Sequence, residues 1–439
     1  MLKVDLFNQL YYNIYRTIIQ RQEGIKMEKT VIELFAGVGG FRCGLNNVEL
    51  KNDKVIENGN WNFVWANQWE PSTKSQEAYD CYVKRFGEKD ASNLDIFQVD
   101  KKKVPKNSLL CGGFPCQDYS VAKSRSKSHG IEGKKGVLWW AIIDTIKAKK
   151  TPFLFLENVD RLLVSPAKQR GRDFGIILRS LHDLGYAVQW RVINAGEYSE
   201  PQKRRRTYIF AYHKSTNYYK SLKGIAASEI IYNKGVFNEF KTTEIEQEFN
   251  VINISKDYYK DLTDVSDKFK FEFYNSGVMV DGKIYTSKLK PVDNPIKSLR
   301  SIREKGTVDE KYFLSKEKLK SFEYLKGGKK IPRVKPNGDP YTYAEGSMPF
   351  PDNLDAPART MLTSESGTSR MTHVIEDMKT KNLRLLTPKE CERINGFPDN
   401  WTDTGMSDKR RYFMMGNALV VGIVARIGKA IESIIENEN

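Results

Sequence analysis

Residues 31–44 read V-I-E-L-F-A-G-V-G-G-F-R-C-G, an apolar run that leads through a glycine-rich turn into a helical pattern. Glycine lets a backbone approach a ligand closely, and the first turn of a helix offers free amide donors. The stretch contains no lysine, which excludes phosphate binding of the P-loop kind. Glycine turns after a first strand serve many nucleotide-like ligands and sometimes none. The motif alone therefore predicts a strand–turn–helix unit but no particular ligand.

Further short apolar runs follow along the chain, separated by stretches with helical spacing. The runs are Val31–Phe35, Phe63–Ala66, Leu109–Cys111, Phe153–Leu156, Val188–Ile193 and Thr207–Tyr212. This alternation predicts strand–helix units and an α/β fold with an open, doubly wound, mostly parallel sheet. Sheets of this kind bind ligands at the carboxyl ends of their strands.

Composition restricts the class of protein. The 439 residues include 71 Lys+Arg against 55 Asp+Glu, a net charge of +16 that predicts a polyanionic partner. A hydrophobic content of 40% excludes a chain that is disordered throughout. No stretch approaches ~18 uninterrupted apolar residues, which excludes a membrane span. Five cysteines without a C-x-x-C pair indicate neither a disulfide framework nor a metal site, so we expect a reduced, cytoplasmic protein.

Changes in composition divide the chain into four parts. Residues 1–29 predict an N-terminal helical extension, and residues 30–213 the main part of the α/β domain. Residues 214–380 are richer in Lys, Tyr, Ser, Asn and turn dipeptides, and predict a separate, irregular domain. Residues 381–439 return to helical patterns, with a capping box at Thr387–Glu390, and are expected to rejoin the first domain.

Polar groups follow several predicted strands. Ala66–Glu70 (A-N-Q-W-E) ends the second strand, and Asp95 and Ile96 are placed to follow the third. Cys116 follows a G-G-x-P turn after the run at Leu109. A lone cysteine is more often a small buried residue than a nucleophile, by ~4 to 1, but a loop at a strand end favours the nucleophile.

Two further motifs carry charge. Glu157 and Asn158 end an apolar strand, and they predict either a carboxyl group at the ligand edge of the sheet or a helix cap. Residues 201–208 read P-Q-K-R-R-R-T-Y. Because alternate residues of a strand face the same way, Gln202, Arg204 and Arg206 can point at one site, although a surface charge run has the same composition.

In this order, the motifs resemble those of the cytosine carbon-5 DNA methyltransferases of bacterial restriction-modification systems. The matching stretches are F-A-G-V-G-G at 35–40, P-C-Q at 115–117, E-N-V at 157–159, Q-x-R-x-R at 202–206, the stretch 383–401 and M-G-N-A-L-V at 415–420. The resemblance covers roughly residues 31–213 and 383–435. The unmatched middle stands where this family inserts its target-recognition domain.

The resemblance implies transfer of a methyl group from S-adenosylmethionine to carbon 5 of a cytosine flipped out of double-stranded DNA. It implies that the Cys116 thiolate attacks carbon 6 of the cytosine. It also implies that Glu157, kept protonated by burial, donates to ring nitrogen 3, and that Arg204 and Arg206 support the base, this carboxyl group and the thiolate. The implied cofactor residues are Phe35, Gly37, Val38, Gly40, Gln68, Trp69, Asp95, Ile96, Pro115, Leu138, Asn417 and Ala418. The implied DNA contacts are Gln117, Ser120, Lys123, Arg125, Lys127 and Gln202, the segment after Cys116 closing over bound DNA.

Several alternatives remain at this point. Gln68 stands where many members of the family carry Glu, so either Gln68 or Glu70 holds the ribose. A tRNA cytosine methyltransferase on the same scaffold, or a non-catalytic DNA-binding module, would share the pattern. The long insert argues against the first, and the intact thiol, carboxyl and arginine motifs argue against the second. We expect a monomeric, cytoplasmic, nucleoid-associated enzyme that works alongside a restriction endonuclease without a stable complex. The sequence predicts no recognition site.

Overall fold

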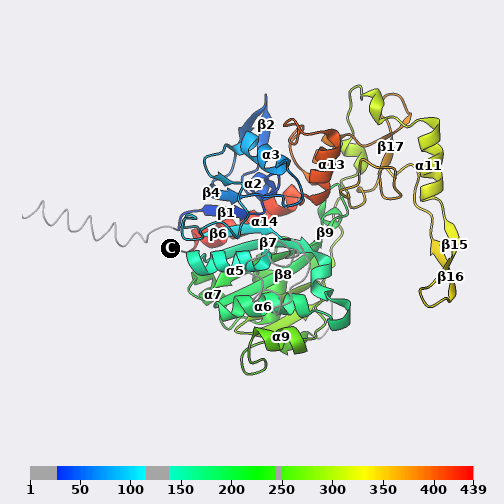
Figure 1. Cartoon of the computed structure of the whole chain (residues 1–439). Helices are drawn as coiled ribbons and strands as arrows, with labels where there is room; N and C mark the ends of the chain where they lie inside the picture. Colours follow the sequence, from blue (N-terminus) through cyan, green and yellow to red (C-terminus); the bar gives the residue numbers. More distant parts are fainter. Residues whose placement is uncertain (1–26, 115–137, 244–248, 439) are drawn as a thin grey trace, which may run out of the picture.

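The computed structural model describes residues 27–114, 138–243 and 249–438 (Figure 1). Its central element is a ten-stranded sheet with the order β11-β13-β12-β8-β9-β7-β6-β1-β4-β5. The strands are β1 (Thr30–Leu34), β4 (Asn62–Asn67), β5 (Ala91–Ser92), β6 (Leu109–Gly113), β7 (Phe153–Val159), β8 (Tyr186–Asn194), β9 (Arg205–His213), β11 (Asn250–Asn253), β12 (Ser276–Val280) and β13 (Lys283–Ser287). All six predicted strand positions are confirmed.

The parallel part of the sheet contains the point at which strand order reverses. Strands β5, β4, β1, β6 and β7 run parallel, and β1 lies between β4 and β6. From β7 onward, through β9, β8, β12, β13 and β11, each neighbour is antiparallel. Ligands of doubly wound sheets bind beside such a reversal, at the carboxyl ends of the strands. The glycine turn after β1 is therefore at the expected position.

Helices cover both faces of this sheet, because successive residues of a buried strand point to opposite sides. Val31 packs into a core with α2 (Gly40–Leu45), α3 (Glu77–Phe86) and α14 (Val421–Glu436). Ile32 packs into a second core with α5 (Leu138–Lys149), α6 (Arg172–Asp183) and α9 (Leu262–Lys268). This arrangement confirms the predicted doubly wound α/β fold.

The boundary expected at residue 214 needs correction. Strands β11, β12 and β13 extend the large sheet, with Ser276–Met279 paired to the edge of β8. The apolar side chains of Val278, Met279 and Ile284 are buried there. These strands are short and stand among Lys- and Tyr-rich stretches, so their alternation is too brief to show in the sequence.

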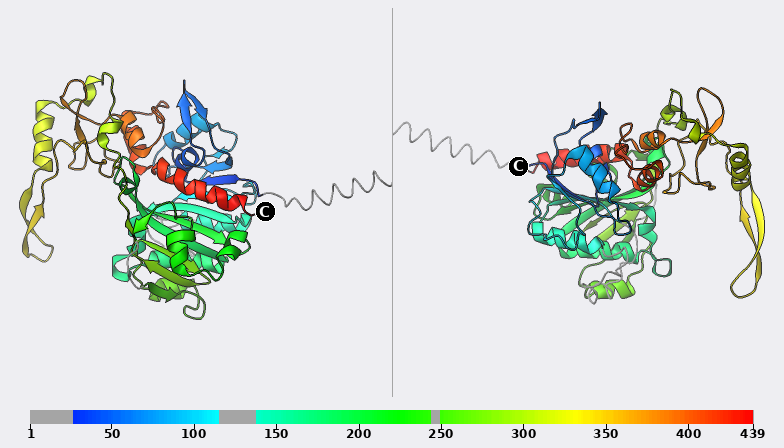
Figure 2. Two further views of the ribbon diagram at one scale, coloured as in Figure 1. Left: turned by 180° about the vertical axis from the view of Figure 1, so that it is seen from behind. Right: turned by 45° about the horizontal axis from the view of Figure 1, so that its top comes forward.

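A second lobe begins only near Leu299 (Figures 1 and 2). Its elements are α10 (Leu299–Ile302), α11 (Lys316–Lys326), the hairpin β15 (Lys329–Val334) and β16 (Pro340–Glu345), and the pair β17 (Val374–Glu376) and β18 (Leu383–Leu385). The chain then passes through α12 (Pro388–Asn395) and α13 (Asp408–Asn417) back to the sheet. The capping box predicted at Thr387 is confirmed, with Glu390 N donating to Thr387 Oγ1 at 3.2 Å. None of the helices in the described ranges has both the length and the apolar character needed to span a bilayer.

The C-terminal helix α14 lies directly against α2, the helix that follows the glycine turn. A Cβ atom on Gly44 would lie 2.6 Å from Val424 Cγ1 and 3.0 Å from the Val421 carbonyl oxygen. No side chain fits at this crossing. The close approach fixes the last helix of the chain onto the first helix of the sheet.

We therefore expect Gly44→Ala to lower the free energy of unfolding by about 1–3 kcal/mol, since overpacking here outweighs the better helix propensity of alanine. Urea denaturation measures the change. Gly306→Ala is the matched control, because a Cβ there would meet no atom within 4 Å. An unchanged midpoint in Gly44→Ala would contradict the tight crossing.

Candidate active site

The glycine turn reverses the chain at the carboxyl end of β1. Phe35, Gly37 and Gly39 all have positive φ, of 57°, 57° and 84°. A Cβ on Gly39 would lie 2.5 Å from the ring of Phe86, so glycine is required there for two reasons. A Cβ on Gly37 would meet no atom within 4 Å. The backbone at Gly37 thus borders open space.

Three distant segments hold this turn in place. Gly37 N donates to Gln68 Oε1 at 2.8 Å, which links the turn to the end of β4. The indole Nε1 of Trp401 donates to the Val38 carbonyl at 2.8 Å. A Cβ on Gly40 would lie 2.9 Å from Leu419 Cγ, so the segment after α13 also packs onto the turn.

The loop after β5 is attached to the end of β4. Asn67 Nδ2 donates to the Leu94 carbonyl at 2.9 Å, and Gln68 N donates to the Ser92 carbonyl at 3.0 Å. The Asp95 carboxylate accepts a hydrogen bond from Phe97 N at 3.0 Å. Large apolar side chains remain exposed at this end of the strands, with exposed fractions of 39% for Trp69, 54% for Leu94 and 45% for Phe97.

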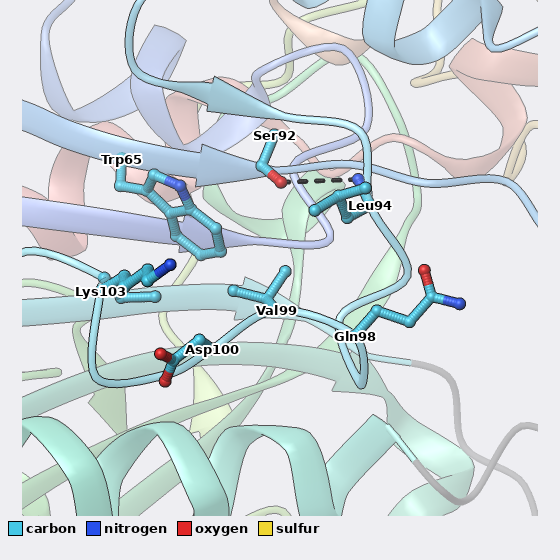
Figure 3. Close-up of a pocket in the computed structure, with 8 residues that line it drawn as sticks. Trp65, Ser92, Leu94, Gln98, Val99, Asp100 and Lys103 are labelled. Carbon is cyan, nitrogen blue, oxygen red and sulfur yellow. Dashed lines mark hydrogen bonds between the residues drawn. The ribbon is translucent and has the colours of Figure 1, made fainter. Parts of the chain in front are cut away.

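A cavity of about 280 Å³ borders the same loop (Figure 3). Its apolar lining residues are Trp65, Leu94, Val99 and Val104. Of the described residues that we predicted to bind a cofactor, none lines this cavity. The predicted cofactor surface is instead the open edge formed by the glycine turn and the ends of β4 and β5.

Glu70, the alternative to Gln68, is engaged elsewhere. Its Oε1 pairs with Arg410 Nη2 at 2.8 Å, and its Oε2 accepts from Ala78 N at 3.3 Å. Arg410 also contacts Glu77, so the cluster joins α13 to the start of α3. Gln68, in contrast, contacts the glycine turn directly. The structure thus places Gln68 nearer to the turn, while the ribose contact itself stays a prediction.

Glu157 and Arg206 form an ion pair across the antiparallel strands β7 and β9. The distance from Arg206 Nε to Glu157 Oε1 is 2.8 Å, and their side chains are 16% and 14% exposed. Val159 is the residue paired with Arg206, so Glu157 is its diagonal neighbour on the same face. The other carboxylate oxygen, Oε2, lies 3.6 Å from where a Cβ on Gly113 would be. The carboxyl group therefore sits at the end of β6.

Asn158 fixes the chain at the same place. Its side chain is 1% exposed, and Nδ2 donates to the Phe114 carbonyl at 2.8 Å. Phe114 directly precedes Pro115 and Cys116, which lie outside the described residues. Asn158 was predicted only as part of a polar pair or a cap; the structure shows that it binds the backbone directly after β6, at Phe114, beside Glu157.

Gln202 and Arg204 do not share the position of Arg206. Gln202 is fully buried, with Nε2 donating to Asn395 Oδ1 at 2.7 Å and Oε1 accepting from Met361 N at 2.9 Å. Arg204 donates to the carbonyls of Met361 (3.3 Å) and Gly416 (3.0 Å), and burial lowers its pKa to about 9. The expected DNA contact of Gln202 is thus corrected, because both ends of its amide already join the sheet to the second lobe and to α12.

A family model and known relatives now identify this arrangement. The model of C-5 cytosine-specific DNA methylases matches residues 29–433. The chain belongs to the C-5 cytosine-specific DNA methylase family. It is 48% identical over 406 residues to the Type II methyltransferase M.Sau3AI of Staphylococcus aureus, covering 92% of this chain and 95% of that protein. It is 26% identical to M.HpaII of Haemophilus parainfluenzae, covering 92% and 88% of the two chains.

The fold is also similar to that of solved methyltransferases. The crystal structure of S. pombe Dnmt2 methyltransferase superposes with a TM-score of 0.55 at 16% sequence identity, covering 92% of this chain and 98% of that one. At this identity the similarity concerns the fold alone. It agrees with the doubly wound sheet described above.

The remaining predicted residues of this DNA methylase fall into two groups. Asn417 is exposed at the end of α13, Ala418 and Leu138 are half-buried, and Ile96 is buried in the core that contains Ile32. The others lie outside the described residues: Pro115, Cys116, Gln117, Ser120, Lys123, Arg125 and Lys127. Within the described ranges, no group of His, Cys, Asp and Glu side chains is arranged to hold a metal ion.

One carboxyl group beneath the turn was missed by sequence reasoning. Glu33, in the middle of β1, is fully buried, and its Oε1 accepts from Phe41 N at 3.2 Å at the start of α2. Burial raises the pKa of Glu33 to about 8. In the sequence it stands between apolar residues of a strand, where only the pairing of β1 with both neighbours shows that it cannot reach water.

This carboxyl group makes stability depend on pH. Because its folded pKa of about 8 exceeds the ordinary value of 4.5, the folded state binds the proton more tightly, and stability falls as pH rises from about 4.5 to about 8. We expect Glu33→Gln to flatten this decline by a few kcal/mol. Unfolding free energies of both proteins from pH 5 to pH 8 measure the difference. Parallel curves would show that Glu33 does not titrate in this window.

Proposed function

We propose that this DNA methylase transfers a methyl group from S-adenosylmethionine to carbon 5 of a cytosine flipped out of duplex DNA, with Cys116 as nucleophile. Carbon 5 of cytosine is a poor nucleophile. Addition of the Cys116 thiolate to carbon 6 forms an S–C bond and makes carbon 5 electron-rich enough to accept the methyl group. Carbon 5 then attacks the methyl carbon, the bond from that carbon to the sulfonium sulfur breaks, and S-adenosylhomocysteine leaves as the product. Loss of the carbon-5 proton restores the ring double bond and breaks the S–C bond at carbon 6, which releases the Cys116 thiolate.

The observation that carries this proposal is the cluster at the ends of β6, β7 and β9. Arg206 holds one oxygen of Glu157 at 2.8 Å, and the carboxyl group faces Gly113, three residues before Cys116. Asn158 holds the Phe114 carbonyl at 2.8 Å in the same place. A carboxyl group oriented in this way is suited to donate a proton or a hydrogen bond to ring nitrogen 3 of the flipped cytosine while Cys116 attacks carbon 6. Arg204, the residue directly before β9, donates to the carbonyls of Met361 and Gly416 and so holds the start of this strand.

The surface beside the glycine turn fits S-adenosylmethionine. When bound, this cofactor supplies an activated methyl group on a positively charged sulfur. The exposed rings and side chains around Trp69 and Leu94 offer apolar cover for a purine base, and the space beside Gly37 admits a close backbone approach. We assign this surface to Phe35, Gly37, Val38, Gly40, Gln68, Trp69, Asp95 and Ile96, completed by Pro115, Leu138, Asn417 and Ala418.

The second lobe is suited to reading the target sequence. Its loop at Ala358–Met361 is bound to Gln202 and Lys203, which directly precede β9, so it lies next to the strand that carries Arg206. The net charge of +16 favours binding to the phosphates of duplex DNA. We assign further DNA contacts to Gln117, Ser120, Lys123, Arg125 and Lys127.

The names of two relatives support a proposal for the biological role. M.Sau3AI and M.HpaII are both named Type II methyltransferases. We propose that this chain protects host DNA from a restriction endonuclease with which it forms no stable complex, and that it acts as a monomer in the cytoplasm. We expect the enzyme to methylate cytosine in duplex DNA and not in tRNA.

Cys116→Ser tests the proposal. A hydroxyl group is far less nucleophilic than a thiolate near pH 7, so methylation of duplex DNA should fall at least ~1000-fold, with cofactor and DNA binding retained. Duplex DNA containing 5-fluorocytosine should trap a covalent complex with the parent protein and none with the variant.

Cys111→Ala is the matched control, because Cys111 is fully buried in β6 and burial raises the pKa of its thiol well above the ordinary value. It should keep the covalent complex. Full activity in Cys116→Ser, or loss of trapping in a folded Cys111→Ala, would contradict the assignment.

A further inference from the structure

The hairpin β15–β16 projects from the second lobe and is visible as the isolated yellow ribbon of Figures 1 and 2. Its strands pair in register from Lys329↔Glu345 to Val334↔Pro340. The tip, Lys335–Asp339, is closed by a hydrogen bond from Lys335 N to the Asp339 carbonyl at 2.8 Å. The chain therefore builds a regular two-stranded ribbon with a defined turn.

Along most of its length the ribbon has no core of its own. Val334 and Tyr341 are 69% and 39% exposed, and the two strands form a sheet with no third strand among the described residues. An isolated two-stranded hairpin is marginally stable in water. A ribbon that extends so far without packing partners is better explained by a binding partner than by a contribution to the fold.

The base of the ribbon is anchored to the loop that reaches the active-site strands. Arg370 Nη1 donates to the Leu325 carbonyl at 3.0 Å and pairs with Glu345 Oε2 at 3.2 Å. Arg370 belongs to the same loop as Met361, which contacts Gln202 and Arg204. Through these contacts the direction of the ribbon is set relative to the catalytic sheet.

The charge of the ribbon is positive where it faces solvent. Residues 329–345 contain four basic side chains (Lys329, Lys330, Arg333 and Lys335) and two acidic ones (Asp339 and Glu345). Glu345 is paired with Arg370 from outside the ribbon. The Arg333 guanidinium packs over the Tyr343 ring of the neighbouring strand, 4.0 Å from the centre of the ring. Lys330, Arg333 and Lys335 are all exposed.

We propose that this ribbon, residues 329–345, binds duplex DNA beside the base pairs that the enzyme recognises, through phosphate contacts of Lys330, Arg333 and Lys335. The inference rests on the proposed action on duplex DNA. Six residues per strand reach roughly 20 Å at ~3.3 Å each, which corresponds to about six base pairs at ~3.4 Å. Two-stranded ribbons also have the width that a DNA groove admits.

The test compares short and long duplexes. One duplex contains only the recognised sequence with about two flanking base pairs per side, and the other extends it by about ten. We expect the parent protein to bind the long duplex about tenfold more tightly. The triple variant Lys330→Gln, Arg333→Gln, Lys335→Gln should bind the short duplex as tightly as the parent does. It should lose most of the tenfold gain in affinity that the parent shows on the long duplex. The slope of log Kd against log salt on the long duplex should fall by about two to three.

A matched variant removes the same charge at the other end of the molecule. Lys256, Lys260 and Lys270 are exposed beside α9, far from the ribbon in Figure 1. Changing these three lysines to Gln should leave the tighter binding of the long duplex unchanged. Since all substituted side chains are exposed, equal thermal unfolding of all proteins confirms that the fold is kept.

Three outcomes would overturn the inference: an unchanged gain and salt slope in the ribbon variant, an equal loss on both duplexes, or the same loss in the α9 variant. All variants should still methylate the same cytosine. If the parent itself neither binds nor methylates the duplex, the proposed function fails; if it does and the ribbon variant behaves identically, only the ribbon inference fails.

Discussion

The glycine turn after β1 can take its shape only because segments more than 300 residues later in the chain hold it. The indole of Trp401 donates to the Val38 carbonyl, and Leu419 packs where Gly40 has no side chain. A turn with positive φ at Phe35 is intrinsically unfavourable, so it needs such external support. The surface that we propose for the cofactor therefore depends on segments near both ends of the described chain, and the second lobe is inserted between them.

Strands β7 and β9, and the residues that directly precede β9, also link distant parts of the molecule. The reversal from parallel to antiparallel pairing at β7 and β9 lets an arginine on one strand reach a carboxyl group on its neighbour. Gln202 and Arg204, a few residues earlier, are used in the opposite direction and bind the second lobe and the segment after α13. The short stretch from Gln202 to Arg206, which leads into β9, thus contacts both the Glu157 carboxyl group and the second lobe.

Local patterns in the sequence were sufficient to predict the strand positions, the glycine turn and the helix cap at Thr387, because each depends on residues close in the chain. Strands β11 to β13 could not be predicted in this way, since their place is set by the exposed edge of β8 and not by a long alternation. The resemblance implied that Arg204 and Arg206 both support the site; in the structure Arg206 pairs with Glu157, whereas Arg204 donates to backbone carbonyls. The roles of Asn158, Trp401 and Glu33 depend on backbone groups brought close only by the complete fold, for which a single sequence has no signal.

The proposed dependence of cofactor binding on the C-terminal segment is tested most directly by the dissociation constant of S-adenosylmethionine for Trp401→Phe, measured by calorimetry. The variant keeps an aromatic ring but leaves the Val38 carbonyl without its donor, which should weaken binding about five- to tenfold. Trp190→Phe, an equally buried tryptophan in the other core, is the control and should bind as the parent does. Equal affinities for parent and Trp401→Phe would contradict this account of how the turn is held.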